Sequence, residues 1–280
     1  MAATNLSLTQ FSLVEVVPGY WRATFDHPPI NLMTAVTAAE LRAIVEAAET
    51  ADDLRVLVFD SANPDFFFAR YDLSAGPLPS EPGPTGLPAF LDTTVRLGDL
   101  RAVTVAQIEG RARGGGNELA LACDLRYAAL ETAVFGQPEI GSALVPAGGG
   151  LERLVPLIGR SRTLEIAATG DDYDASTAER YGWVTRALPA TELPAHVDAL
   201  ARRLASFDGD ALAAIKRLVN RTTVPDAASF LDSADAATRL VTSPGFRPAL
   251  ERLRAQAQSA GPDFDLHMGF HVGAANRPTP

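Results

Sequence analysis

The stretch IEGRARGGGNELALACDL, residues 108–125, sets three consecutive glycines between a β-prone run and a short helical segment. Without Cβ atoms, the main chain there can approach a ligand closely and point N–H groups at its oxygen. The positive end of the following helix favours negative charge at the same place. Glu118, two residues after Gly116, adds a carboxylate on the first helical turn. The stretch therefore predicts either an oxyanion-binding turn beside a base, or a tight turn in which Glu118 only stabilises the helix N-terminus.

Two nucleotide-binding alternatives fit these glycines less well. A phosphate-binding P-loop needs a Lys-Ser or Lys-Thr pair after the glycines, and Asn117-Glu118 stands there instead. The glycine spacing also differs from the dinucleotide-binding pattern.

A second stretch, VFGQPEIGSALVPAGGGLERL at residues 134–154, carries Glu139 directly after Pro138 among mostly apolar neighbours. A carboxylate in apolar surroundings has a raised pKa, which suits proton transfer. The alternative is a solvated loop glutamate. The glycine run 148–150 leads into another helical pattern.

The third stretch is NPDFFFARYDL, residues 63–73. Three phenylalanines before a charged pair indicate a strand end that turns sharply into a loop. Taken alone, the stretch indicates core packing and no site.

The remaining pattern predicts an α/β core followed by helices. Runs at 12–17 and 20–26 around Pro18-Gly19 predict a hairpin, Thr34 opens a helix to residue 51, and 55–60 reads as a strand buried on both faces. Further segments complete the pattern: strands at 103–109, 123–128 and 134–140, and helices at 89–99, 149–157, 161–168, 175–181, 191–205, 209–221, 226–241 and 245–257. The segment 74–89, rich in Pro, Gly and Ser, predicts irregular structure.

Composition restricts the class of protein. The chain has 280 residues, 47% of them hydrophobic and 21% charged, as in an ordinary globular protein. Its net charge of −10 argues against a nucleic-acid or anionic-membrane partner. No apolar run is long enough for a membrane span, and the N-terminus does not read as a secretory signal. The single cysteine, Cys123, allows a reducing compartment, so we expect a cytoplasmic protein.

Histidine spacing gives no metal-ligand pattern, and we expect neither a metal nor a redox cofactor. His267 and His271 are four residues apart, but no third ligand is evident near them.

In this order and spacing, RGGGNELALACDLRYA, FGQPEI with VPAGGGLERL, and IGRSRTLEIAATGDDYDASTAERYGWVTRAL at 158–188 resemble the crotonase superfamily, the enoyl-CoA hydratase/isomerase family. The resemblance runs from about residue 12 to 205. It implies a spiral of ββα units over residues 1–205, a helical oligomerisation region at 206–258 and an irregular tail at 259–280. It further implies a homotrimer or a hexamer made of two trimers.

The resemblance also implies the chemistry: an enoyl-CoA hydratase, a lyase of fatty acid metabolism. Coenzyme A would enter as part of the acyl-CoA substrate, so no separate cofactor is implied. The main-chain N–H groups of Tyr71 and Gly115 would form an oxyanion hole, and Glu118 and Glu139 would serve as the two catalytic carboxylates. The residues implied to lie around the substrate are Ala69, Arg70, Leu73, Gly114, Pro138 and His27.

The sequence departs from the family pattern in two places. The usual AGxDL turn reads Ala69-Arg70-Tyr71-Asp72-Leu73, with arginine in place of glycine. Arg70 either meets a coenzyme A phosphate or is a solvated surface residue; if the turn needs φ > 0, Arg70 is strained. The C-terminal tail also lacks the usual ending of the family.

Other activities on the same scaffold remain open at this point, because fold does not settle function. They are double-bond isomerisation, C–C cleavage and thioester hydrolysis. A further alternative is a catalytically silent binding or assembly protein.

Overall fold

A computed structural model gives the structure of residues 6–72, 74, 81–223, 225 and 227–277. Within these ranges, no helix is both long and apolar enough to cross a membrane.

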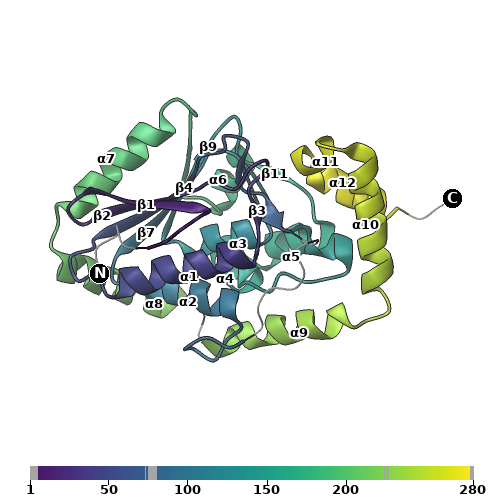
Figure 1. The fold of residues 1–280 in the computed structure, drawn as a ribbon, viewed down its shortest axis with the longest axis horizontal. Helices are drawn as coiled ribbons and strands as arrows, with labels where there is room; N and C mark the ends of the chain where they lie inside the picture. The colour runs from purple at the N-terminus through teal and green to yellow at the C-terminus, as the bar shows by residue number, and fades with distance from the viewer. Residues whose placement is uncertain (1–5, 73, 75–80, 224, 226, 278–280) are drawn as a thin grey trace.

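A six-stranded sheet forms the larger part of the core (Figure 1). In spatial order its strands are β1 (Phe11–Val17), β2 (Tyr20–Phe25), β4 (Val56–Ser61), β7 (Val103–Ile108), β9 (Leu125–Ala129) and β12 (Arg186–Leu188). The predicted hairpin is confirmed, since β1 and β2 pair antiparallel around a turn where Gly19 has φ of 82°. All other pairs in this sheet are parallel. β4 is buried on both faces as predicted, which suits its continuous apolar run.

Two smaller sheets stand beside the large one. The four-stranded sheet runs β11 (Tyr173–Asp174), β10 (Val134–Gly136), β8 (Arg111–Arg113), β5 (Phe66–Phe68), and the two-stranded sheet pairs β3 (Leu32–Met33) with β6 (Arg70–Tyr71). The three phenylalanines of β5 are all buried, and the chain turns after them into β6. All six of these strands have only two or three residues, too few to show alternation in the sequence.

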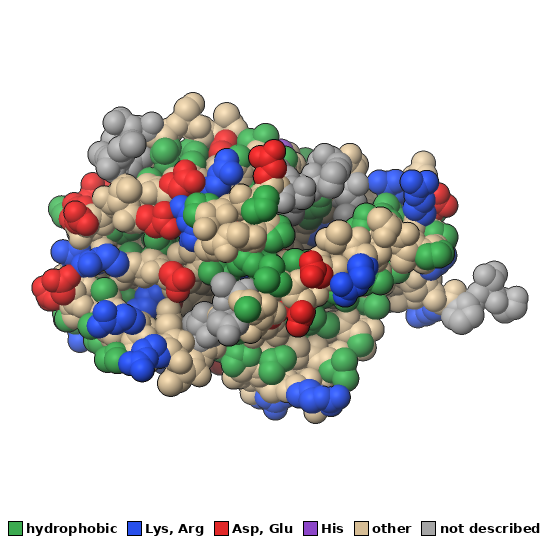
Figure 2. Space-filling model, turned by 90° about the horizontal axis from the view of Figure 1, so that it is seen from below, with side chains coloured by type: hydrophobic (Ala, Val, Ile, Leu, Met, Phe, Trp, Pro, Cys, Tyr) green, Lys and Arg blue, Asp and Glu red, His purple; other side chains and the backbone are tan. Residues whose placement is uncertain are grey.

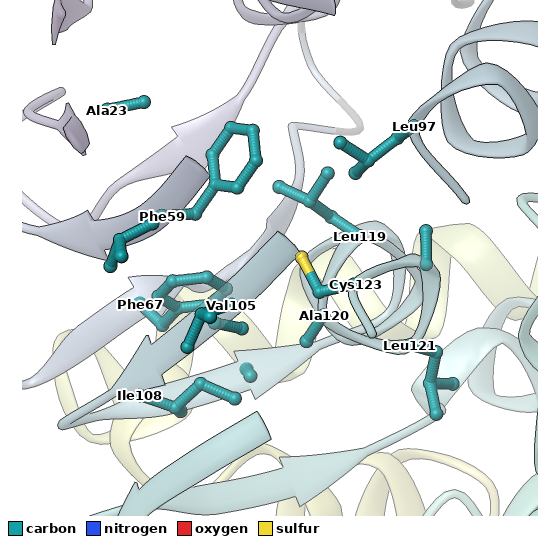
Figure 3. Close-up of a cluster of buried hydrophobic side chains, with 14 of the residues drawn as sticks. Ala23, Phe59, Phe67, Leu97, Val105, Ile108, Leu119, Ala120, Leu121 and Cys123 are labelled. Atoms are coloured by element: carbon teal, nitrogen blue, oxygen red, sulfur yellow. The ribbon is translucent and has the colours of Figure 1, made fainter. Parts of the chain in front are cut away.

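Helix α3 (Gly115–Ala122) packs on β8, β5 and β6 of the two smaller sheets and on helices α2 (Ala89–Asp99) and α4 (Gly150–Ile158). Figure 3 shows Leu119, Ala120 and Cys123 close to Phe59 of β4, Phe67 of β5 and Val105 of β7, in one buried apolar cluster. At its N-terminal end the helix approaches the main chain of β5: a Cβ atom on Gly116 would lie 2.3 Å from the Phe68 carbonyl oxygen. The glycine run therefore lets the first turn of α3 rest on the strand that leads into β6.

The helices largely match the predicted segments. They are α1 (Ala35–Glu49), α2 (Ala89–Asp99), α4 (Gly150–Ile158), α5 (Arg160–Thr169), α6 (Ala175–Tyr181), α7 (Leu193–Ala205), α8 (Gly209–Thr223), α9 (Leu231–Val241) and α10 (Phe246–Ala260). Thr34 begins α1 as expected, with its hydroxyl accepting the Thr37 N–H in a capping box. Helix α7 packs on strands of the large sheet, and helices α8 and α9 lie below this sheet in Figure 1.

Two predicted segments were wrong. The strand predicted over 134–140 ends at Gly136, and a 3₁₀ turn, η2 (Pro138–Ser142), follows because Pro138 cannot donate to a strand ladder. The tail predicted as irregular from residue 259 contains α11 (Asp263–Leu266) and α12 (Met268–Ala275), which pack beside α10 (Figure 1). Their apolar residues form a buried cluster with α10. Three of these residues are spaced four apart in the sequence: Phe264, Met268 and Val272.

Candidate active site

The predicted oxyanion turn lies at the start of α3. Gly114 caps the helix with φ of 51° and ψ of −127°, a conformation that a residue with a side chain rarely adopts. Its N–H donates to the Gly136 carbonyl oxygen at 3.1 Å, which ties the turn to β10. Gly115 is partly exposed although the residues on both sides of it are buried. Because the first amides of a helix have no acceptor within the helix, the N–H of Gly115 belongs to the positive end of α3.

Glu118 lies on the first turn of α3 as predicted, with 4% of its surface exposed. Its Oε1 accepts two main-chain hydrogen bonds, from Gly148 N at 2.6 Å and from Gly150 N at 3.1 Å. Both donors belong to the second glycine run, where Gly149 caps α4. The N-terminus of α4 therefore holds this carboxylate in a fixed orientation, a contact that the sequence did not indicate.

Glu139 lies on η2, close to the same turn. A Cβ atom on Gly114 would lie 2.9 Å from its Oε1. Its Oε2 is buried without a hydrogen-bond partner in the described part of the chain. Because this oxygen is shielded from water, Glu139 is not the solvated loop glutamate of the alternative interpretation.

Both carboxyl groups hold their protons more tightly than usual. Burial raises the pKa of Glu118, although the Gly148 and Gly150 amides act to lower it. Burial also raises the pKa of Glu139, and the charge of Glu118 raises it further. The two amides stabilise the ionised form of Glu118, whereas the Oε2 atom of Glu139 has no hydrogen-bond partner among the described residues. The arrangement favours an ionised Glu118 beside a protonated Glu139.

The turn that carries Tyr71 lies near the same place. Tyr71 of β6 pairs with Met33 of β3, and the Asp72 N–H donates to the Met33 carbonyl oxygen at 2.8 Å. The Met33 sulfur lies 3.1 Å from the position that a Cβ atom on Gly115 would take. Met33 thus contacts both segments that carry the two candidate amide donors.

Arg70 does not carry the strain considered for this turn. Arg70 and Tyr71 form strand β6, and neither is among the non-glycine residues with positive φ. The guanidinium of Arg70 lies against the Asp265 carboxylate, with Nε to Oδ1 at 2.9 Å. It is therefore not the solvated surface arginine that the sequence allowed.

The other predicted substrate-binding residues have these places in the structure, apart from Leu73, which lies outside the described residues. Ala69 is buried, and its N–H donates to the Asn31 carbonyl oxygen at 3.0 Å. His27 is half-buried, with Nδ1 2.8 Å from the Leu32 carbonyl oxygen. Pro138 is the first residue of η2, directly before Glu139.

Two residues that the sequence did not single out also border the glycine turns. One is Met33; the other is Phe90 of α2, whose Cε1 lies 2.6 Å from the Cβ position of Gly148 and 3.8 Å from that of Gly115. Both are apolar residues, a type that core packing alone would explain, so nothing in the sequence marks them as site residues. They give the site an apolar wall beside the two carboxylates.

Behind the second glycine run, Arg153 of α4 is buried and donates to the Gly148 carbonyl oxygen at 3.1 Å. Its guanidinium also lies 4.8 Å from the centre of the Phe230 ring. These contacts fix the loop that holds Glu118.

The histidines of the C-terminal segment pair with one carboxylate. His267 Nδ1 and His271 Nε2 each lie 2.8 Å from an oxygen of Asp263. No group of three or more His, Cys, Asp or Glu side chains in the described ranges is placed to hold a metal ion.

The chain is similar to known proteins of one family. The family model for enoyl-CoA hydratase/isomerase matches residues 19–238. A probable enoyl-CoA hydratase of Mycobacterium tuberculosis is 40% identical over 132 residues, 47% of this chain and 51% of that protein. This chain thus matches about half the length of that relative. A carnitinyl-CoA dehydratase of Citrobacter koseri is 32% identical over 200 residues, 71% of this chain and 76% of that protein.

Solved structures show the same fold over nearly the whole chain. A crystal structure of a candidate enoyl-CoA hydratase from Streptomyces avermitilis has a TM-score of 0.88 and 34% identity, and covers 98% of this chain and 99% of that one. The chain therefore has the crotonase-type fold. This chain belongs to the enoyl-CoA hydratase/isomerase family.

Proposed function

We propose that the protein is an enoyl-CoA hydratase, which adds water across the C2–C3 double bond of an enoyl-CoA thioester. The observation that carries the proposal is the pair of buried carboxyl groups, Glu118 and Glu139, beside the glycine turn of α3, with unequal environments and raised pKa values. The named activities of the relatives support it: one is a probable hydratase and another a dehydratase, the same reaction type in opposite directions.

In this proposal the thioester carbonyl oxygen accepts hydrogen bonds from the main-chain N–H groups of Tyr71 and Gly115. Charge that develops on the oxygen as the enolate forms is then stabilised by two donors and by the positive end of α3. Removing one such donor typically lowers the rate about 10²–10³-fold. The shared contact of both segments with Met33 supports this placement.

The unequal environments assign the roles of the two glutamates. Ionised Glu118, fixed by two amides, accepts a proton from water while the water oxygen bonds to C3. Protonated Glu139 then gives its proton to C2 of the enolate. One hydroxyl and one proton have been added to the substrate, and a proton that moves from Glu118 to Glu139 restores the starting state.

The test is the loss of enoyl-thioester absorbance when the protein is added to crotonyl-CoA. We expect Glu139→Gln and Glu118→Gln each to lower kcat by about 10²-fold or more, because general acid–base catalysis contributes about 10²–10⁴-fold. Glu165→Gln, at an exposed glutamate of α5, is the matched control and should keep full activity. Undiminished hydration by the Glu139→Gln variant would refute the assignment of the proton donor. A rise in free thiol without hydration would instead indicate a thioester hydrolase.

The same proposal includes a homotrimer, or a hexamer of two trimers, in the cytoplasm. Exposed apolar side chains on α8 support an association surface: Ile215, Leu218 and Val219 are 61%, 59% and 55% exposed. Figure 2, which views the molecule from the side of α8 and α9, shows hydrophobic side chains grouped between scattered charged ones. Sedimentation of the purified protein tests this part, and a monomer at micromolar concentration would contradict it.

A further inference from the structure

The two places where the sequence departs from its family pattern contact each other. Arg70 stands in the AGxDL turn where the pattern has glycine, and Asp265 stands in the C-terminal segment that lacks the usual ending. Arg70 Nε donates to Asp265 Oδ1 at 2.9 Å, and Nη2 lies 3.5 Å from Oδ2. The side chains are only 17% and 15% exposed, so water and salt screen this ion pair weakly.

The third nitrogen of the same guanidinium reaches the main chain of the oxyanion turn. Arg70 Nη1 donates to the Tyr71 carbonyl oxygen at 3.2 Å. The peptide group between Tyr71 and Asp72 is thus held at both ends, since its N–H donates to the Met33 carbonyl oxygen at 2.8 Å. A continuous chain of contacts runs from the Asp265 carboxylate through Arg70 to the main chain of Tyr71.

The C-terminal segment has separate anchors that do not use the Asp265 side chain. Buried Arg113 donates to the main-chain oxygen of Asp265 at 2.6 Å, and Arg111 donates to that of Leu266 at 2.9 Å. Arg113 also pairs with Asp172, which accepts the Gly269 N–H at 3.0 Å. A change confined to the Asp265 carboxylate therefore leaves the segment docked.

The same segment also contacts the turn that carries Glu139. A Cβ atom on Gly141 of η2 would lie 2.8 Å from Val272 of α12, and Asn276 Nδ2 donates to the Gly141 carbonyl oxygen at 3.1 Å. One short segment of the same chain thus touches both the Tyr71 turn and the Glu139 turn.

We propose that Asp265 is a positioning residue for the oxyanion turn: it holds Arg70 against the Tyr71 main chain, so that the C-terminal helices complete the active site of their own chain. This inference rests on the proposed hydratase function for its catalytic consequence. The glycine of the family pattern has no side chain for such a contact, and in this chain the arginine makes the turn depend on the C-terminal segment.

The experiment compares steady-state hydration of crotonyl-CoA by the wild type, Asp265→Asn, Arg70→Gln and the double variant. We expect Asp265→Asn to lower kcat about tenfold with KM within about twofold, because the turn acts on transition-state charge more than on substrate binding. The double variant should be no slower than the slower single variant, as expected for two groups that act as a unit. Asp265→Glu, which keeps the carboxylate, should recover most of the rate.

Asp210→Asn is the matched control, because it removes an exposed ion pair with Arg101 that has no contact with the Tyr71 turn or the C-terminal segment among the described interactions. It should leave both kcat and KM unchanged. Wild-type kcat in Asp265→Asn would overturn the inference.

A second measurement does not depend on the hydratase activity. Hydrogen exchange of the ligand-free protein should become about tenfold faster at the main-chain amides of residues 66–72 in Asp265→Asn, with α10 unchanged. Equal exchange at residues 66–72 in the wild type and the variant would overturn the inference. Loss of protection throughout α10 and α12 would also overturn it, because the role of Asp265 would then be purely structural. If the wild type fails to hydrate crotonyl-CoA, the proposed function fails while this comparison still decides the positioning role.

Discussion

Gly116 sets how closely the first turn of α3 approaches strand β5. A Cβ atom there would lie 2.3 Å from the Phe68 carbonyl oxygen and 2.5 Å from the Phe68 Cβ atom, whereas ordinary contacts begin near 3.4 Å. In Gly116→Ala the helix end must therefore move by about 1 Å relative to β5. That end carries both the Gly115 amide and Glu118.

The shift is small for the fold but large for the chemistry. Overpacking a core site by one methyl group costs about 1–3 kcal/mol of unfolding free energy, and the better helix propensity of alanine offsets up to about 1 kcal/mol of it. A displacement of about 1 Å in a catalytic group can lower the rate about 10²-fold. We therefore expect Gly116→Ala to remain folded while losing most of its hydratase activity.

The assay is the rate of crotonyl-CoA hydration per folded molecule, with thermal unfolding of the same samples. Gly98→Ala is the matched control: Gly98 lies within α2, and its nearest contact would be the Ala122 carbonyl oxygen at 3.8 Å. This control should be fully active and no less stable than the wild type. Full activity in Gly116→Ala would refute the claim that the position of this helix end governs the reaction.

Three further outcomes are expected. Because the pKa of Glu139 is raised in the folded state, the folded protein binds this proton more tightly than the unfolded one, and the free energy of unfolding falls as pH rises from the ordinary carboxyl range through the folded pKa. Glu139→Gln should therefore raise Tm relative to wild type more at about pH 9 than at about pH 5. An equal change of Tm at both pH values would contradict this. Gly148→Ala would place a Cβ atom 2.4 Å from Glu118 Oε2, so kcat should fall, and wild-type kinetics would show that the loop yields freely. Lys216→Met removes the ion pair with Asp124 at 2.8 Å while Thr104 still donates to that carboxylate, and should cost about 1–3 kcal/mol in denaturant unfolding, with activity per folded molecule unchanged.

The sequence predicted the elements that have long, regular patterns. The α2 and α6 segments match the predicted bounds, and the β1–β2 hairpin is where the turn residues placed it. The strands of the two smaller sheets were mostly missed, because two or three residues cannot show a period. Helices α11 and α12 were missed because Gly269 and Gly273 interrupt the short apolar stripe of Phe264, Met268 and Val272, which is buried against α10.

The site was predicted in part. The sequence predicted that Glu118 lies on a first helical turn, and the structure confirms this. It also predicted an apolar environment for Glu139, and in the structure one carboxylate oxygen of Glu139 is buried and unpaired among the described residues. It could not indicate that the Gly148 and Gly150 amides hold Glu118, since a contact across thirty residues leaves no local pattern. Nor could it pair Arg70 with Asp265, which are 195 residues apart.

The proposed reaction depends most on where a thioester oxygen binds, and a crystal structure with a saturated acyl-CoA bound addresses this directly. We expect the thioester oxygen about 2.7–3.1 Å from the main-chain nitrogens of both Tyr71 and Gly115, with its C2 atom facing Glu139. A thioester oxygen that contacts neither nitrogen, or an acyl chain bound away from the two glutamates, would contradict the proposed oxyanion hole.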